Sequence, residues 1–142
     1  MKISARNQLT GRITHIEDEG GLCLLTLTTE NGMNIQAQIS RQSRHRLKLA
    51  LGSTAVAMIK ASGIIIATDL APMELSAENC ISGTVSLVEK GSVNNVVTLD
   101  IGGGISLCAT ITLYSSESLA LEPGNRATAV FNANQVVLGV LV

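Results

Sequence analysis

Two short segments of the chain combine hydroxyl groups, turn amides and a cation in a way that suits the binding of an anion. Residues 4–7 read Ser-Ala-Arg-Asn, and residues 60–62 read Lys-Ala-Ser. A tetrahedral dianion that leaves water must receive many hydrogen bonds, which backbone N–H groups and hydroxyls donate without adding excess charge. The two segments therefore predict a site for a small oxyanion.

A second set of donors lies at the start of two short stretches with a helical pattern, residues 40–49 and 112–121. Ser40 and Ser43 begin the first stretch, and Thr112 and Ser115 begin the second. Free N–H groups and the positive end of the helix dipole favour an anion at such a place. An isolated Ser or Thr there more commonly only caps the helix. Both interpretations stay open at the level of the sequence.

The elements that must position these residues occur twice along the chain. A shift of 72 positions, without a gap, aligns residues 3–7 with 75–79 and residues 59–62 with 131–134. Matches that cluster in short motifs indicate a duplicated unit. Pro72 marks the seam, because proline disfavours the continuation of a regular element. The sequence predicts two domains, residues 1–70 and 73–142.

Each repeat has the pattern of short strands. Residues 22–28 and 93–101 are rich in aliphatic side chains, and glycines follow both where hairpin turns need positive φ. The apolar runs 64–66 and 136–138 are typical of strands buried on both faces. We expect an all-β chain of two tandem Greek-key β-barrels of the oligonucleotide/oligosaccharide-binding (OB) type, each with one short helix. Units this small bury little surface, so we expect them to oligomerise.

Composition argues against several classes of function. The net charge is −1 and the only aromatic residues are Tyr114 and Phe131, which is unfavourable for nucleic-acid binding. No signal peptide or apolar run of membrane-spanning length is present, so we expect a cytoplasmic protein without a membrane contact. No catalytic motif occurs and no enzymatic activity is expected. We interpret Cys23, Cys80 and Cys108 as small core residues.

Charge is distributed unevenly between the repeats. Residues 1–70 hold eight Lys and Arg against five acids, whereas residues 73–142 hold two against six. Five basic side chains crowd the first helical stretch, namely Arg41, Arg44, His45, Arg46 and Lys48. They form either a solvated helix face or a surface that guides an anion or partner.

The ordered set of motifs resembles the Mop (molbindin) family over the whole chain, twice. The motifs that carry the resemblance are Ser-Ala-Arg-Asn at 4–7, Lys-Ala-Ser at 60–62, Gly-x-Val-Asn at 91–94 and Thr-x-x-Ser at 112–115.

The resemblance implies a tandem protein that assembles as a homo-trimer and binds molybdate or tungstate between barrels, without catalysis and without another cofactor. It implies a first class of oxyanion site in which one barrel faces a helix start of a neighbour, formed by Ser4, Ala5, Arg6, Lys60, Ala61 and Ser62 with Thr112 and Ser115. It also implies an axial site on the Gly-x-Val-Asn turn, formed by Gly91, Val93 and Asn94.

The two repeats depart from these motifs in different ways. Glu78 replaces the arginine and Asn132 replaces the lysine of the second repeat, while residues 19–22 of the first repeat lack the asparagine of the axial turn. A dianion needs positive compensation in a largely dehydrated pocket. We therefore expect the sites built on the second repeat to be weak or empty.

These observations together lead to one expected function and several alternatives. We expect intracellular storage or homeostasis of molybdate or tungstate. The alternatives are an OB-fold nucleic-acid-binding module and a degenerate Mop protein that no longer binds an oxyanion. A sensor half of a regulator or an accessory domain of a transport ATPase would need an attached domain, for which we expect no room in 142 residues.

Overall fold

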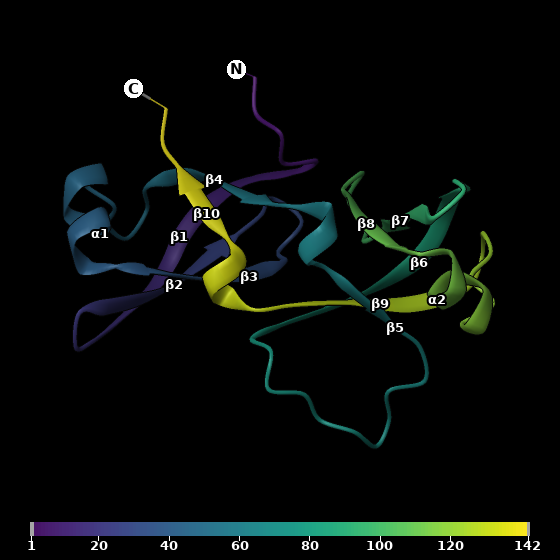
Figure 1. The fold of residues 1–142 in the computed structure, drawn as a ribbon. Helices are drawn as coiled ribbons and strands as arrows, with labels where there is room; N and C mark the ends of the chain where they lie inside the picture. Colours follow the sequence, from purple (N-terminus) through teal and green to yellow (C-terminus); the bar gives the residue numbers. More distant parts are fainter. Residues whose placement is uncertain (1, 142) are drawn as a thin grey trace.

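The computed structural model describes residues 2–141, which form two strongly curved five-stranded antiparallel sheets side by side (Figure 1). The first repeat contributes β1 (Asn7–Glu19), β2 (Leu22–Thr28), β3 (Asn34–Ser40), α1 (Arg41–Leu47), β4 (Thr54–Ile59), the 3₁₀ turn η1 (Ala61–Gly63) and β5 (Ile65–Ala67). The second contributes β6 (Asn79–Glu89), β7 (Asn94–Asp100), β8 (Ser106–Thr112), α2 (Leu113–Ser118), β9 (Arg126–Phe131), the 3₁₀ turn η2 (Ala133–Gln135) and β10 (Val137–Gly139). The predicted all-β class, with one short α-helix in each repeat, is confirmed.

The core follows the alternation that a half-buried strand requires. In β1 the side chains of Leu9 and Ile13 are buried while their neighbours face outward, and β6 repeats the pattern with Ile81 and Val85. One continuous cluster of buried aliphatic side chains runs through both sheets. Small β-branched and aliphatic residues therefore fill the interior, as the scarcity of aromatics predicts.

A glycine lets β1 curve closely against β2. A Cβ atom at Gly11 would lie 2.5 Å from the carbonyl oxygen of Thr28, and one at Gly83 would lie 2.5 Å from that of Asp100. The register of β1 against β2 shifts just beyond this point, between Ile13 and His15. Close approach and bulge together bend the long strand around the core.

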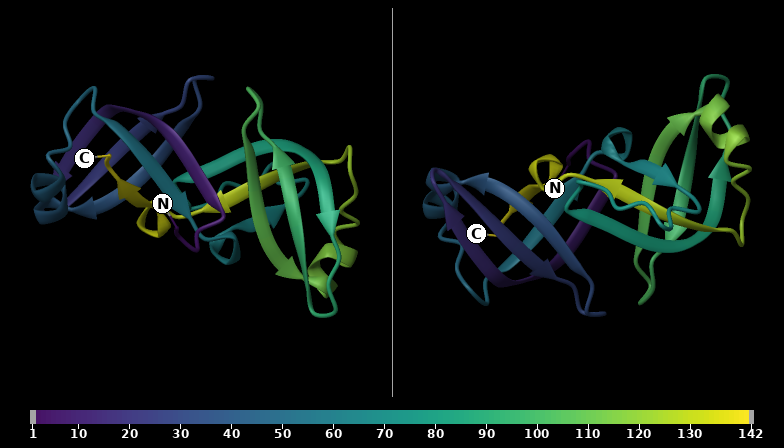
Figure 2. Two further views of the ribbon diagram at one scale, coloured as in Figure 1. Left: turned by 90° about the horizontal axis from the view of Figure 1, so that it is seen from above. Right: turned by 90° about the horizontal axis from the view of Figure 1, so that it is seen from below.

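The last strand of each repeat belongs to the sheet of the other repeat. The sheets have the strand orders β10-β4-β1-β2-β3 and β5-β9-β6-β7-β8. In Figure 2 the yellow C-terminal strand accordingly crosses to the purple and blue sheet in both views. Each sheet thus contains residues from both of the predicted domains, 1–70 and 73–142. Such an exchange joins the two units as in a domain swap within one chain.

The expectation that residues 64–66 and 136–138 are strands buried on both faces is wrong. β5 and β10 have three residues each and pair on one side only, with β9 and β4 respectively. The side chains of Ile65 and Val137 are 64% and 60% exposed, while their flanking neighbours point into the core. A continuous apolar run does not by itself distinguish a central strand from an edge strand with one outward apolar residue.

Two buried asparagines join the sheets across the exchange. The side-chain Nδ2 of Asn7 donates to the carbonyl oxygen of Cys108 at 2.8 Å, and its Oδ1 accepts from the Cys108 N–H at 2.7 Å. Asn79 makes the same pair of bonds with Gln36, at 2.9 and 2.8 Å. Each amide side chain therefore pairs with the other sheet as a strand backbone would, and both are only 2% exposed.

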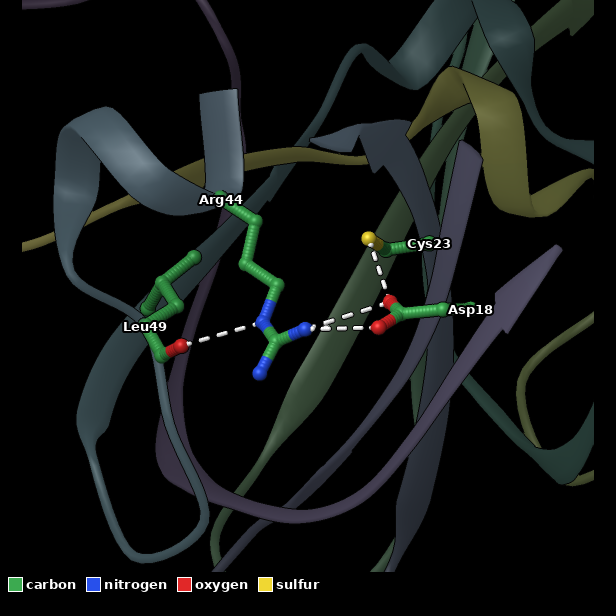
Figure 3. A network of polar contacts seen from close by, with 4 residues as sticks. All are labelled: Asp18, Cys23, Arg44 and Leu49. Carbon is green, nitrogen blue, oxygen red and sulfur yellow. Dashed lines mark hydrogen bonds and ion pairs between the residues drawn. The ribbon is translucent and has the colours of Figure 1, made fainter. Parts of the chain in front are cut away.

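Helix α1 is tied to the first sheet by a partly exposed network of polar contacts (Figure 3). The guanidinium of Arg44 donates from Nη1 to both carboxylate oxygens of Asp18, at 2.9 and 3.2 Å, and from Nε to the carbonyl oxygen of Leu49. The Cys23 thiol donates to Asp18 Oδ1 at 2.8 Å. This thiol bond and the nearby Arg44 lower the pKa of Asp18. Burial, and then the bond to Asp18, raises the pKa of Cys23.

The three cysteines occupy different environments, and the interpretation of all three as core residues is wrong. Cys23 is fully buried, as expected, but Cys108 is half-buried and Cys80 is exposed. Cys80 follows the buried Asn79 in β6, so the alternation of the strand turns its side chain outward.

No helix among residues 2–141 is long and apolar enough to cross a membrane.

We expect Asn79→Ala to destabilise the fold without any change in surface charge. The substitution leaves the N–H and carbonyl groups of Gln36 without their partner, which costs about 1 to 3 kcal/mol for each buried group. Urea denaturation measures the free energy of unfolding. Asn134→Ala, at an exposed residue, is the matched control. Equal stabilities of the two variants would contradict the structural role of Asn79.

The contribution of Asp18 to stability is expected to depend on pH. Its pKa lies below the ordinary value of 3.8, so the ionised carboxylate stabilises the folded state. This contribution is present at neutral pH and is lost as the pH falls through the lowered pKa. Asp18→Asn should therefore be less stable than the wild type at pH 7, and the difference should shrink at strongly acid pH. Denaturation curves across this range measure it, and a constant difference would contradict the assignment.

Candidate functional site

The first of the predicted oxyanion segments lies directly beside the second. Asn7 at the start of β1 pairs with Ile59 at the end of β4, so residues 4–6 leave the sheet next to Lys60 and η1. The side chains of Ser4, Arg6, Lys60 and Ser62 are exposed there. The structure thus brings together six of the predicted residues, Ser4, Ala5, Arg6, Lys60, Ala61 and Ser62.

Residues 4–6 and 60–62 together form what we call the corner of the first repeat, and residues 76–78 and 132–134 form the corner of the second. The backbone of the first corner presents a hydrogen-bond donor without a partner. Lys60 is extended, with φ −69° and ψ 135°, and no side chain caps the turn η1 that follows. Among residues 2–141, no acceptor is bonded to the N–H of Ala61. The unbonded N–H of the buried Ala61 therefore lies between Lys60 and Ser62, whose side chains are exposed, and beside residues 4–6. This donor set matches a small oxyanion.

The corresponding corner of the second repeat is closed by side chains. Glu78 Oε1 accepts a hydrogen bond from the N–H of Ala133 at 2.8 Å. Gln135 Oε1 accepts from the N–H of Asn132 at 2.7 Å, and its Nε2 donates to the carbonyl oxygen of Gly63 at 2.9 Å. The two corners therefore have similar backbone conformations, but only in the second do side chains bond to the backbone N–H groups.

Both helix starts are capped as the commoner interpretation predicts. Thr112 Oγ1 accepts from the N–H of Ser115 at 3.1 Å and donates to its hydroxyl at 2.8 Å. Ser40 and Ser43 repeat this pair at 3.0 and 2.9 Å. The N-cap role of Thr112 and Ser40 is confirmed.

Within one chain the helix starts do not meet the corners. Helices α1 and α2 lie at opposite outer ends of the molecule, whereas η1 and η2 lie between the sheets (Figures 1 and 2). Helix α2, which begins after Thr112, is therefore separated from η1, which begins after Lys60. A site that combines them needs a helix start from another chain.

The turn predicted as an axial site is held against α2. The carbonyl oxygen of Val93 accepts from the N–H of Leu113 at 2.9 Å, and the N–H of Gly91 donates to Oδ1 of Asn95 at 3.1 Å. Gly91, Val93 and Asn94 are exposed, Val93 to 70%. Asn95 is buried and positions the turn, a residue that the motif did not single out.

The structure also assigns a role to residues that the sequence left without one. Asn7 belongs to the Ser-Ala-Arg-Asn motif and Asn79 is its match in the second repeat, and both side chains bond across the sheets. Their recurrence at the same register, unlike the changed neighbours Arg6 and Glu78, was the available signal.

A sizeable cleft lies elsewhere. It has a volume of about 800 Å³ and runs between the outer face of β1 and the hairpin tip after β7, with Thr10, Arg12, Asn31 and Gly103 among its lining residues. None of the predicted oxyanion residues lines it.

Comparison with known proteins identifies related chains over the whole length. The TOBE domain model matches residues 3–66 and again 75–138. The molybdenum transport protein ModE of Herbaspirillum seropedicae is 41% identical over 140 residues, and the molybdenum-pterin-binding protein MopA of Rhodobacter capsulatus is 34% identical over 140 residues. These matches cover 99% of this chain but 52% and 53% of those proteins, so the chain spans about half the length of the curated relatives that it matches.

A solved structure has the same fold throughout. The cytoplasmic molybdate-binding protein ModG, crystallised with molybdate bound, superposes with a TM-score of 0.96 at 35% sequence identity. The match covers 99% of this chain and all of the ModG chain. It confirms the prediction of two tandem OB-type domains. Two copies of one domain model, at the two positions that the repeat predicts, confirm the resemblance to tandem Mop proteins: the chain belongs to the TOBE-domain family.

Proposed function

We propose that this protein binds molybdate or tungstate reversibly at interfaces between barrels and stores or buffers the oxyanion in the cytoplasm. The observation that carries the proposal is the corner where Lys60 and the unused N–H of Ala61 lie beside residues 4–6. ModG, which is described as cytoplasmic and as holding molybdate, supports it through its shared fold.

The chemistry of the corner suits a dianion that is held but not transformed. Lys60 supplies a full positive charge, and Ser4, Ser62 and the Ala61 N–H supply hydrogen bonds. Arg6 contributes mainly through its backbone amide. Binding without catalysis is the role that we propose for this donor set.

The site is completed by a second chain in this proposal. Thr112 and Ser115 of a neighbour would face the corner, because α2 lies at the outer end of its own chain (Figure 1). Gly91, Val93 and Asn94 would form the axial site, since their turn is exposed beside the same helix. A threefold-symmetric homo-trimer of six barrels satisfies both requirements.

Nucleic-acid binding is a second candidate, because one relative is described as the DNA-binding transcriptional dual regulator ModE of Escherichia coli. OB-type barrels bind single strands by stacking bases on aromatic side chains. Here Phe131 is buried in the core and Tyr114, at 79% exposure, is the one exposed aromatic among the described residues. We therefore propose that these two domains bind the oxyanion and make no direct contact with nucleic acid.

Lys60→Ala should weaken oxyanion binding while the fold stays intact. Loss of a charge-assisted hydrogen bond costs about 1.5 to 3 kcal/mol, which is roughly a tenfold to more than a hundredfold loss of affinity. Calorimetric titration with molybdate, tungstate and sulfate measures it. Lys48→Asn removes the same charge at a residue with φ 55°, which asparagine tolerates, and serves as the control. Equal affinities of the wild type and Lys60→Ala would contradict the role of Lys60.

The protein is expected to form trimers at micromolar concentration. Native mass spectrometry measures the distribution of assemblies directly. A monodisperse monomer would contradict the inter-chain sites, because α2, which Thr112 caps, lies at an outer end of its own chain while η1, which follows Lys60, lies between the sheets.

A further inference from the structure

We propose that the carboxylate of Glu78 is a built-in anion that fills the oxyanion position of the second repeat, so that only the first-repeat corner of each chain binds ligand. This inference rests on the proposed function and adds which half of the chain performs it. The unequal charge of the repeats predicts weak oxyanion sites in the second repeat. The contact of Glu78 with the backbone of that repeat gives a specific reason for this weakness.

The cause is the donor that Glu78 occupies. In the repeat register Glu78 corresponds to Arg6, and Ala133 corresponds to Ala61. Glu78 Oε1 accepts the hydrogen bond of the Ala133 N–H at 2.8 Å, whereas the N–H of Ala61 has no bonded acceptor among residues 2–141. The same backbone donor is thus taken by a carboxylate in one repeat and open in the other.

A tethered carboxylate competes well with a free dianion. A group held on the same chain has an effective concentration in roughly the millimolar range or above. Its bond to a backbone N–H is charge-assisted, and its charge repels an approaching anion. Asn132, at the position of Lys60, offers no cation to offset that repulsion.

Gln135 closes the rest of the corner. Its side chain accepts from the N–H of Asn132 and donates to the carbonyl oxygen of Gly63 in the other turn, so it bridges η1 and η2. The corresponding residue of the first repeat is Gly63 itself, which has no side chain. The first repeat therefore has no side chain at this position to accept from the N–H of Lys60, although its Gly63 carbonyl oxygen accepts the bond from Gln135.

The fold does not need Glu78 to form the turn. The first repeat makes the equivalent turn η1 with Arg6 and Lys60 at the corresponding places and without a side-chain cap. A role restricted to capping the turn is therefore unnecessary. The comparison also indicates that arginine and lysine at positions 78 and 132 are compatible with folding.

The hydrogen bond between Glu78 and the N–H of Ala133 can be tested in the absence of any oxyanion. In ¹⁵N-resolved NMR spectra, Glu78→Ala should move the amide proton of Ala133 upfield, because its carboxylate acceptor is lost. Glu89→Ala removes the same charge from an exposed residue and should leave that resonance in place. An unchanged Ala133 resonance in Glu78→Ala would overturn the inference.

The effect of Glu78 on oxyanion binding is tested by the number of molybdate ions bound per chain. The double variant Glu78→Arg with Asn132→Lys copies the first repeat, and calorimetric titration should show one more molybdate bound per chain than in the wild type. Glu89→Arg with Ser118→Lys makes the same change in net charge at exposed residues and should bind the wild-type number. An equal gain in this control would overturn the inference, because it would show an effect of net charge alone.

The outcomes separate this inference from the proposed function. If the wild type already fills two equivalent inter-barrel sites per chain with one affinity, Glu78 is not a competitor and only the inference fails. If the wild type binds no molybdate, tungstate or sulfate, the proposed function fails and the inference fails with it.

Discussion

The reciprocal pairing of two buried amide side chains with the opposite sheet is the constraint on which the arrangement depends. Asn7 and Asn79 each satisfy one backbone N–H and one carbonyl group of the other sheet, at Cys108 and Gln36. A buried polar group without a partner is costly, so these bonds favour one relative placement of the sheets. They also stand at the first residues of β1 and β6, where the candidate corners begin.

The exchange of β5 and β10 between the sheets then determines where the backbone hydrogen-bond donors of η1 and η2 lie. Because η1 and η2 lead from one sheet to the other, their backbones are held between the sheets, whereas α1 and α2 remain at the outer ends (Figure 2). The polar network of Asp18, Cys23 and Arg44 fixes α1 there (Figure 3). In the function that we propose, one chain therefore carries both halves of the oxyanion site and keeps them apart, which makes assembly a condition of binding.

Duplication leaves each repeat free to change so long as the shared framework is kept. The asparagines at the crossing are identical, while the residues before them have opposite charges, Arg6 and Glu78. The framework residues lie in the core, where a change of size or polarity is costly. Arg6 and Glu78 lie on the surface, where the fold tolerates either charge. In the function that we propose, loss of a site in one repeat is thus compatible with retention of its fold.

The sequence by itself determined the duplication, the all-β class, the strands within 22–28 and 93–101 and the short helices, because each depends on local periodicity and turn residues. It also predicted an oxyanion-binding segment at residues 60–62 through a motif. Only the tertiary structure decided that the last strand of each repeat pairs in the other sheet, that Ile65 and Val137 face outward, and that Glu78 meets the N–H of Ala133. These depend on contacts between residues far apart in the chain, which a local pattern does not encode.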